Sequence, residues 1–356
     1  MSKKILVAMS GGVDSTIAAY KLKATGYDVV GIYFRFWKWR GNDAGHHKEM
    51  ERLHRLADQL GIKLIEADAQ QVFKNRVIKE MFSQLGKGLT PNPCIHCNPA
   101  MKFDFLMTYA QEEQVDFIAT GHYVRAEMKL NGIVGLHKAN DLSKDQSYFL
   151  CGLNQQILKK CIFPLGVTTK RDNTSLASQL DLSFADKPES QDLCFLTNAS
   201  YAQFIQEEIP DIFVSGEIRD ITGNVIGQHH GLPNYTIGQR KGIEIAAGKP
   251  YYVISKDVDR NVLVVGSAED LKFRSMIVSG INWISGLGFG QQICKVKIRY
   301  RSPDYDCKFT KLDEKNYRVE FSHDIRDITP GQYAVFYNGD EMLGGGMIRS
   351  VESING

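Results

Sequence analysis

The chain has 356 residues, of which 43% are hydrophobic and 24% are charged. These are ordinary values for a globular protein, and the length predicts two or three domains. The net charge of +2 is too small to indicate a nucleic-acid partner by itself, so any RNA-binding surface must be local. The seven cysteines do not resemble a secreted disulfide framework, and the first apolar run is too short for a signal peptide or a membrane span. We therefore expect a cytoplasmic protein that does not associate with a membrane.

A glycine turn follows the first predicted strand, Ile5–Met9, and precedes a helix-like stretch, Thr16–Thr25. The turn, Ser10–Ser15, has the sequence SGGVDS. A strand, a glycine turn and a helix in this order point backbone N–H groups and the positive end of a helix dipole at one spot, which favours an anion. The turn is neither a Walker loop nor a dinucleotide-binding G-x-G-x-x-G. It matches the SGGxDS pyrophosphate loop (PP-loop) of enzymes that split ATP into AMP and pyrophosphate. The motif therefore predicts that a substrate is adenylated, the alternative being an ordinary turn after a strand.

The first two hundred residues alternate strand-like and helix-like segments. Further apolar runs predict strands at Val29–Phe34, Lys63–Asp68 and Phe117–Thr120. Between them, His47–Leu60 has one apolar face, and apolar residues recur every four positions from Phe73 to Leu85. This alternation indicates an α/β fold with a doubly wound parallel sheet, which binds ligands beyond the carboxyl ends of its strands. We predict such a catalytic domain over residues 1–205, an ATP pyrophosphatase with the adenine nucleotide alpha-hydrolase-like fold.

After about residue 205 the sequence consists of short β-like runs separated by Gly, Asn and Asp turns. We predict a central β-rich domain over residues 206–275 and a C-terminal β-barrel over residues 276–356, with strands at Cys294–Tyr300, Tyr317–Phe321 and Tyr333–Tyr337. In the first of these strands, apolar residues alternate with Lys295, Lys297, Arg299 and Arg301. A period of two would place the four cations on one face of the strand, where phosphate contact is favoured over a merely solvated face.

Two cysteine motifs make the pattern specific. Thr90–Asn98 has the sequence TPNPCIHCN, and Pro188–Phe195 has the sequence PESQDLCF. With the PP-loop and six further motifs in the same order, they resemble the tRNA-specific 2-thiouridylases (the MnmA/TrmU family) over nearly the whole chain. The further motifs are Ala119–Tyr123 (ATGHY), Lys144–Phe149 (KDQSYF), Thr236–Gly242 (TIGQRKG), Arg299–Arg301 (RYR), Pro330–Gln332 (PGQ) and Leu343–Gly346 (LGGG).

The resemblance implies an enzyme that uses ATP to replace the C2 oxygen of the wobble uridine of tRNA by sulfur. Adenylation turns that oxygen into a phosphate leaving group, and a sulfur nucleophile can then attack C2. In the family, the cysteine matching Cys194 carries a persulfide from a sulfur-relay or cysteine-desulfurase donor. The cysteine matching Cys97 assists its release, and the two can join as a disulfide. We also expect a helix to begin near Pro99, so that its dipole favours the thiolate of Cys97.

The chain departs from the family pattern at Cys94, where many members carry aspartate. An acid/base role of that carboxylate therefore cannot be transferred. Cys94, Cys97 and Cys194 could instead hold a [4Fe–4S] cluster whose open iron carries an exogenous sulfide. Zinc is a weaker alternative, because there is no second C-x-x-C motif. The sequence leaves the persulfide and cluster routes open. Buried packing is expected for Cys151, Cys161, Cys294 and Cys307.

The resemblance assigns ATP and tRNA to separate sets of residues. The ATP set is Ala8, Met9, Ser10, Gly11, Gly12, Val13, Asp14, Ser15, Phe34 and Gly121. We expect Phe34 to contact adenine through its backbone or ring, or else to lie in the core, and Gly121 to let the nucleotide approach closely. Mg²⁺ is expected as the counter-ion of the phosphates, with Asp14 as its neighbour or, alternatively, as a helix cap. The tRNA set comprises Asn92, Pro93 and Cys94 at the target base, His122, Lys144, Asp145 and Gln146 at the anticodon arm, and Arg299, Tyr300 and Gln332 as further contacts.

Two other functions compete with this interpretation. An ammonia-using PP-loop synthetase would share the glycine turn but would leave the paired cysteines without a role. A non-catalytic RNA-binding protein with a relic nucleotide loop would bind tRNA but would release no pyrophosphate from ATP.

Overall fold

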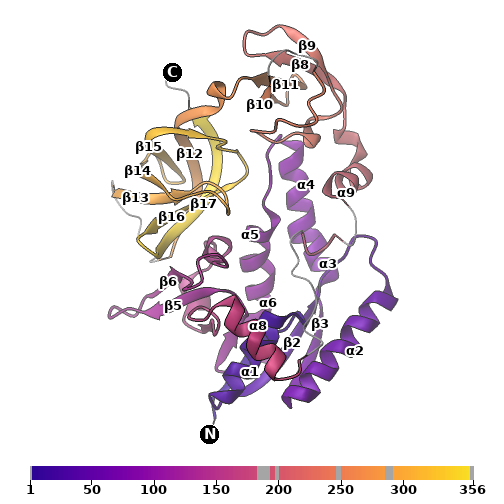
Figure 1. Ribbon diagram of the computed structural model, residues 1–356, viewed down its shortest axis with the longest axis vertical. Helices are drawn as coiled ribbons and strands as arrows, with labels where there is room; N and C mark the ends of the chain where they lie inside the picture. The colour runs from indigo at the N-terminus through magenta and orange to yellow at the C-terminus, as the bar shows by residue number, and fades with distance from the viewer. Residues whose placement is uncertain (1, 183–192, 197–199, 246–249, 285–291, 353–356) are drawn as a thin grey trace.

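The computed structural model describes residues 2–182, 193–196, 200–245, 250–284 and 292–352 of the chain. Three parts are visible in Figure 1. The N-terminal α/β domain forms the lower part of the molecule, with the C-terminal barrel above it on the left and the central β domain at the top right. The predicted fold class, an α/β domain followed by two small β-rich domains, is confirmed.

The N-terminal domain is built around a five-stranded parallel sheet with the strand order β3-β2-β1-β4-β7. Its strands are β1 (Lys4–Ala8), β2 (Asp28–Arg35), β3 (Lys63–Asp68), β4 (Phe117–Ala119) and β7 (Cys161–Ile162). Along β1, Leu6 lies in one hydrophobic cluster and its neighbours Ile5 and Val7 lie in another, and all three are fully buried. Both faces of the sheet are therefore covered, as the alternation of strands and helices predicted.

The strand order changes direction at β1, because β2 and β3 continue the sheet on one side of it and β4 and β7 on the other. Ligands bind at such a switch point in open α/β sheets. The turn after β1 and the segment after β4 (Thr120–Tyr123) leave the same edge of the sheet, since the two strands are parallel neighbours. Two segments more than a hundred residues apart thus meet where the glycine turn lies.

The helices of this domain are α1 (Val13–Ala24), α2 (Asp43–Leu60), α3 (Gln70–Phe73), α4 (Lys79–Gly86), α5 (Pro93–Cys97), α6 (Asp104–Glu112), α7 (Gln155–Leu158), α8 (Lys170–Gln179) and α9 (Tyr201–Glu208). A π-helical segment, Lys74–Ile78, joins α3 and α4 into one continuous helix. Its buried face carries Phe73, Val77, Met81 and Leu85, as predicted. A strict four-residue repeat drifts around an α-helix of 3.6 residues per turn, and the wider π turn keeps these side chains on one face.

The central domain is a four-stranded sheet in the order β10-β11-β8-β9, and the C-terminal domain closes into a barrel because β12 pairs with β17. Their strands are β8 (Gly216–Asp220), β9 (Val225–His229), β10 (Tyr252–Asp257), β11 (Val262–Gly266), β12 (Lys272–Trp283), β13 (Gln292–Lys297), β14 (Tyr305–Lys311), β15 (Asn316–Arg326), β16 (Tyr333–Asn338) and β17 (Glu341–Glu352). The boundary that we placed between residues 275 and 276 falls inside β12. In α9, Phe204 packs on Phe195 at a ring-centroid distance of 5.3 Å, and the boundary that we placed between residues 205 and 206 falls inside this helix.

A hairpin from the N-terminal domain forms part of the sheet of the barrel. Its strands are β5 (Val124–Met128) and β6 (Val134–Lys138). β6 pairs with β17, where Met342 lies opposite Leu136 and both side chains are fully buried. The two domains therefore share one continuous sheet and one hydrophobic cluster, an arrangement that the sequence did not predict.

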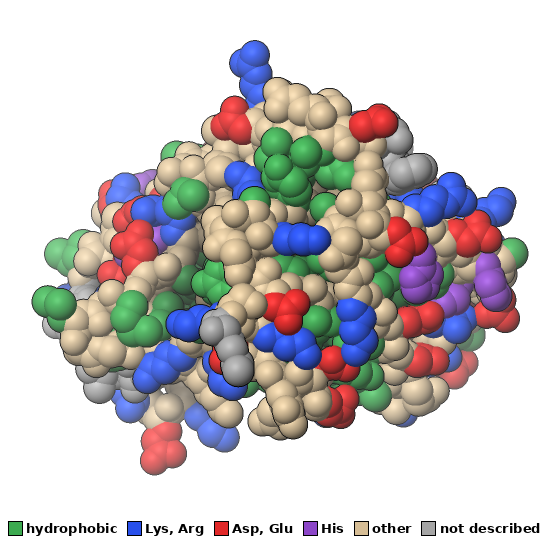
Figure 2. Space-filling view, turned by 90° about the horizontal axis from the view of Figure 1, so that it is seen from below, with side chains coloured by type: hydrophobic (Ala, Val, Ile, Leu, Met, Phe, Trp, Pro, Cys, Tyr) green, Lys and Arg blue, Asp and Glu red, His purple; other side chains and the backbone are tan. Residues whose placement is uncertain are grey.

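Within the described part of the chain, no helix has the length and apolar character needed to cross a membrane. A view from below, onto the end of the molecule that carries the N-terminus, shows Lys and Arg side chains interspersed with Asp and Glu (Figure 2). The two signs of charge are mixed on this face, as the small net charge of the chain leads one to expect.

We expect Met342→Ala to lower the free energy of unfolding by about 2–5 kcal/mol, because it removes a fully buried side chain from the shared core. Urea denaturation followed by circular dichroism and by intrinsic fluorescence measures this. The control is Met128→Ala on β5 of the hairpin that pairs with β17, where the side chain is 63% exposed and a change within about 0.5 kcal/mol is expected. Barrel and N-terminal domain should unfold in one transition, and two separate transitions would contradict a shared core.

Candidate active site

The glycine turn Ser10–Ser15 follows β1 and runs into the first turn of α1, and hydrogen bonds between its own residues hold it. Ser15 Oγ accepts from the backbone N–H of Ser10 at 3.1 Å and donates to the carbonyl of Gly12 at 3.2 Å. Gly11 has a φ of +69°, which favours glycine, and Gly12 caps α1 without a side chain. The N-terminus of α1 and its dipole thus face the turn, as expected for an anion site. The Ser15 hydroxyl is thus used to stabilise the turn.

The segment after β4 packs directly against the first turn of α1. A Cβ atom on Gly121 would lie 2.8 Å from the carbonyl carbon of Asp14 and 2.8 Å from the backbone nitrogen of Ser15. We predicted that Gly121 lets the nucleotide approach closely. Its close contact is instead with α1, the helix that follows the glycine turn. The next residue, His122, stacks its ring on Phe103 at a centroid distance of 5.9 Å. Phe103 belongs to the cysteine-bearing helix, so one short segment contacts both chemical centres.

Asp14 is bonded to two side chains that the sequence analysis did not identify. Lys170 Nζ lies 2.8 Å and 2.9 Å from its two carboxylate oxygens, and Tyr123 Oη donates to Oδ1 at 2.8 Å. Asn173 Nδ2 in turn donates to Tyr123 Oη at 3.0 Å, and burial raises the pKa of the tyrosine. Both oxygens of Asp14 are therefore engaged, which leaves this carboxylate poorly placed as a direct ligand of Mg²⁺.

Phe34 lies in the core rather than at the surface. Its ring stacks on Phe36 and meets Phe105 edge-on, each at a centroid distance of 5.9 Å. Ring stacking on adenine is therefore not possible in this conformation, and the backbone of Phe34 remains the candidate contact. Ala8 and Met9 lie at the carboxyl end of β1, beside the glycine turn.

The helix that carries Cys97 begins at Pro93. Asn92 caps it by accepting a backbone hydrogen bond at 3.4 Å, and proline at the first position favours a helix start. α5 continues without interruption through the π-helical segment Asn98–Phe103 into α6. Our prediction that a helix begins near Pro99 is therefore wrong. Cys97 lies within a helix and is not stabilised by a following N-terminus.

Burial raises the pKa of the Cys97 thiol to about 12 and that of Cys94 to about 11. Repulsion by the negative charge of Cys194 is the second cause that raises both pKa values, and the positive charge of Lys102 lowers them. The structure thus brings the three cysteines close enough to interact electrostatically. The lowered pKa that we expected for Cys97 is not found, because burial outweighs the nearby cation. Cys194 is exposed, whereas Cys94 and Cys97 are half-buried.

The three cysteines do not form a ready metal site. Over the described ranges, no group of three or more His, Cys, Asp or Glu side chains is arranged to hold a metal ion. The three thiols are therefore not arranged around a single ion such as zinc, and a [4Fe–4S] cluster on Cys94, Cys97 and Cys194 stays a prediction. As predicted, buried positions are occupied by Cys151, Cys161, Cys294 and Cys307.

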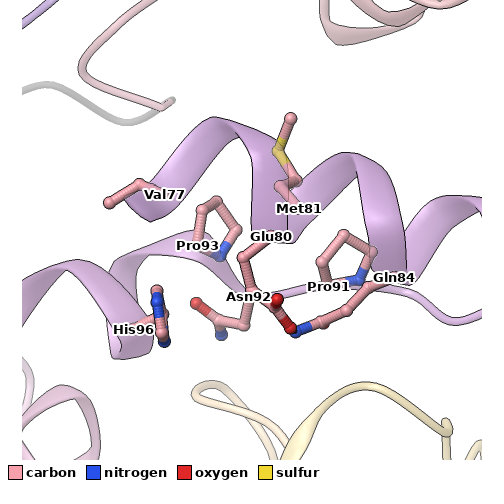
Figure 3. A pocket seen from close by; sticks show the side chains of 8 residues that line it. All are labelled: Val77, Glu80, Met81, Gln84, Pro91, Asn92, Pro93 and His96. Carbon is pink, nitrogen blue, oxygen red and sulfur yellow. The ribbon is translucent and has the colours of Figure 1, made fainter. Parts of the chain in front are cut away.

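A small cavity lies beside the start of α5 (Figure 3). It is lined by Val77, Glu80, Met81, Gln84, Pro91, Asn92, Pro93 and His96. Two of the predicted target-base contacts, Asn92 and Pro93, thus share one cavity. It has room for about one water molecule, so a nucleobase could enter only if the lining residues move apart.

Comparison with known proteins identifies the family. The regions described as the tRNA methyl transferase HUP domain, the tRNA methyl transferase PRC-barrel domain and the aminomethyltransferase beta-barrel domain match residues 3–198, 202–267 and 273–348. The tRNA-specific 2-thiouridylase MnmA of Geobacter metallireducens is 38% identical, over 97% of this chain and 96% of its own length. The chain belongs to the tRNA-specific 2-thiouridylase family.

Another member of the 2-thiouridylase family, MnmA of Symbiobacterium thermophilum, is 39% identical over 98% of this chain and 92% of its own length. Among solved structures, the U34-tRNA thiolase NcsA from Methanococcus maripaludis with its [4Fe-4S] cluster is 19% identical and has a TM-score of 0.36. That alignment covers 58% of this chain and 67% of the NcsA chain, and it is too distant to support an argument about the site.

In this 2-thiouridylase, the predicted tRNA contact Gln332 lies at a junction between two domains. Its Nε2 donates to the carbonyl of Thr90 at 2.9 Å, and the N–H of Thr90 donates to the carbonyl of Pro330 at 3.0 Å. A Cβ on Gly331 would lie 2.7 Å from the backbone nitrogen of Thr90. Hydrogen bonds from the barrel thus fix the loop that leads to the cysteine-bearing helix.

Arg299 also joins two domains. β13 ends at Lys297, so the alternation that we predicted over four cations holds only for Lys295 and Lys297. Arg299 Nη2 donates to the carbonyl of Ile237 in the central domain at 3.2 Å, and burial lowers the pKa of the guanidinium. Next to it, Tyr300 packs on Phe149 at a ring-centroid distance of 4.4 Å. In this 2-thiouridylase both side chains hold domains together rather than lying open to phosphate.

The predicted anticodon-arm contacts are largely internal. His122 is 8% exposed, Thr120 Oγ1 lies 2.7 Å from its Nδ1, and burial holds its pKa well below the usual value. Asp145 is buried and accepts hydrogen bonds from its own loop, and Gln146 Oε1 accepts from the N–H of Tyr123 at 3.0 Å. Lys144 is half-buried. RNA contact by these residues stays a prediction that requires their side chains to be uncovered.

We expect Gly121→Ala to weaken ATP binding by roughly tenfold or more, because the new methyl group must displace the first turn of α1. Isothermal titration with ATP measures this. The control is Gly86→Ala at the end of α4, where nothing lies within 4 Å of the added Cβ and ATP affinity should not change. Equal affinities for the two variants would contradict the contact.

Limited alkylation with iodoacetamide at pH 8 should label Cys194 well before Cys97. At a pKa of about 12, roughly one Cys97 thiol in ten thousand is ionised at that pH, whereas Cys194 is exposed. Peptide mass spectrometry over a time course measures the order of labelling. Labelling of Cys97 should rise about tenfold for each pH unit below its pKa. Faster labelling of Cys97 than of Cys194 would contradict the burial of its thiol.

Proposed function

We propose that this chain catalyses the ATP-dependent 2-thiolation of the wobble uridine in the anticodon arm of tRNA. The observation that carries the proposal is the segment after β4. Gly121 packs on the helix that follows the glycine turn, and the adjacent His122 stacks on the helix of the paired cysteines. A nucleotide at the turn and a sulfur nucleophile on the helix therefore lie on either side of one short loop. The curated relatives named tRNA-specific 2-thiouridylase support the same reaction.

The first step is adenylation. The uridine O2 attacks the α-phosphate of ATP, and pyrophosphate leaves with the bonding electron pair. The N-terminus of α1 and the backbone of Ser10–Gly12 favour the charge on the phosphates. Mg²⁺ is expected to be held mainly by phosphate oxygens and water, since Asp14 is already paired with Lys170.

The second step transfers sulfur. Cys194 is exposed, which suits a residue that must receive a persulfide sulfur from a sulfur-relay or cysteine-desulfurase donor protein. The terminal sulfur of this persulfide bonds to C2 as AMP leaves. The Cys97 thiolate then attacks the Sγ of Cys194, which forms a Cys97–Cys194 disulfide and leaves the second sulfur on the base. An external dithiol resets the pair.

The high pKa of Cys97 sets a condition on this scheme. In the conformation described, the Cys97 thiol is protonated at neutral pH. The thiolate forms when tRNA binding changes its surroundings or when a base removes the proton, and Lys102 favours the charged form. No step of this scheme uses a [4Fe–4S] cluster, which stays the alternative route for sulfur delivery.

The test is thiolation of a tRNA transcript by the purified chain with ATP and a persulfide donor, followed by mass spectrometry of the digested nucleosides. Cys194→Ser and Cys97→Ser should each lower 2-thiouridine formation by roughly 100-fold or more while ATP binding is retained. Cys94→Asp should keep its activity with the persulfide donor. Loss of activity in Cys94→Asp would favour the cluster route, and ammonia-dependent product formation by a cysteine variant would favour a synthetase. If the chain binds tRNA but releases no pyrophosphate from ATP, it is a non-catalytic RNA-binding protein.

A further inference from the structure

Cys294 on β13 and Cys307 on β14 face each other inside the C-terminal barrel. The two residues lie directly opposite in the antiparallel ladder, and their Sγ atoms are 3.6 Å apart. The two strands lie side by side in Figure 1. Both side chains belong to the hydrophobic cluster of the barrel, where they are 6% and 3% exposed. The sequence analysis assigned both cysteines to packing and did not pair them.

The backbone at these two positions already has the spacing of a disulfide. Directly opposite residues in antiparallel strands have Cα atoms about 4.5–5.5 Å apart, inside the range of about 4.4–6.8 Å that disulfides span. The sulfur atoms need to approach by only about 1.5 Å to reach bonding distance, which a rotation of the side chains can supply. A bond between them therefore requires no change in the pairing of the strands.

The closed barrel makes this pair slow to react. The hydrogen bond with Cys294, together with burial, raises the pKa of Cys307, and thiolates rather than thiols are the reactive form. The ladder offers a place for local opening, because the pairing of β13 with β16 begins only at Lys295. In the described part of the sheet, Cys294 is thus paired with one neighbouring strand only.

A peroxide is an oxidant small enough to reach such a pair. One thiol attacks a peroxide oxygen, the O–O bond breaks, and a sulfenic acid and water are formed. The second thiol then attacks the sulfenic sulfur, so that the S–S bond forms, the S–O bond breaks and a second water leaves. Two thiols are thereby oxidised by two electrons, and one hydrogen peroxide is reduced to two water molecules.

We propose that Cys294 and Cys307 are a modification site at which peroxides form a reversible cross-strand disulfide. The loop between the two cysteines carries Arg299 and Tyr300, which contact the central and the N-terminal domain. A disulfide fixes both ends of this loop. Oxidation therefore stiffens the part of the barrel that joins the three domains, at a place separate from the paired cysteines of α5.

The test treats the full chain carrying Cys194→Ser with hydrogen peroxide, so that the Cys97–Cys194 disulfide cannot form. Trypsin separates Cys294 from Cys307 unless a disulfide joins the two peptides, because it cuts after the intervening Lys295, Lys297, Arg299 and Arg301. Mass spectrometry without reductant should show the joined peptide, and dithiothreitol should release its halves. The disulfide should raise the Tm by roughly 2–5 °C, because it restricts the unfolded chain.

The matched controls are Cys307→Ser on the same background and the cysteines Cys151 and Cys161. Cys307→Ser should give no joined peptide and no rise in Tm with peroxide, since serine is similar in size but cannot form the bond. Cys151 and Cys161 are also buried, yet neither sulfur contacts another cysteine of the described chain. Both should therefore remain thiols under the same treatment.

Three outcomes would overturn the proposal. Two intact thiols after prolonged treatment, or a sulfinic acid at either position without the joined peptide, would show that the two sulfurs do not meet. Equal oxidation of Cys151 and Cys161 would mean that peroxide reacts only with unfolded chains. A lower Tm of the joined form would show that the disulfide strains the barrel instead of stiffening it.

Discussion

The close packing of Gly121 on the first turn of α1 is the constraint on which the site depends. Only a residue without a side chain allows the loop after β4 to touch the backbone of Asp14 and Ser15. The contact sets where Tyr123 can reach Asp14 and where His122 can stack on the cysteine-bearing helix. The phosphate-binding end of α1 and the thiols are thereby fixed relative to each other by backbone contacts, which are stiffer than contacts between long side chains.

The local features of the fold could be predicted because each rests on a short stretch of sequence. Strand runs, helical periodicity and the glycine turn are properties of a few adjacent residues, and those predicted in the N-terminal domain were located correctly, except for the helix start near Pro99. Features that depend on distant residues were missed. Arg52 and Lys170 reach the turn from separate helices, and Gln332 reaches Thr90 from the other end of the chain. The protonation of Cys97 was misjudged for the same reason, since burial by distant segments, rather than its place on a helix, decides its pKa.

Several residues that the family resemblance assigned to tRNA hold the three domains together in this conformation. Gln332 joins the barrel to the N-terminal domain, Arg299 joins the barrel to the central domain, and Tyr300 packs on Phe149. These interactions bury polar groups that would otherwise bind water or phosphate. If these side chains contact RNA, their hydrogen bonds between domains are replaced by bonds to the RNA. Because Gln332 is bonded to Thr90, tRNA binding would then change how the loop before Cys94 is held. Residues at such junctions can serve both purposes at different stages of one reaction cycle.

The hairpin β5–β6 limits how this chain can be divided. The hairpin lies in the middle of the N-terminal domain, yet β6 is a neighbour of β17 in the sheet of the barrel. A fragment ending before the barrel would leave β6 as an unpaired edge and would expose Leu136 to water, a combination that promotes aggregation. The catalytic half could not be recombined with other RNA-binding modules by simple fusion at the sequence boundary. In this architecture the nucleotide-binding domain and the barrel have to be inherited as a pair.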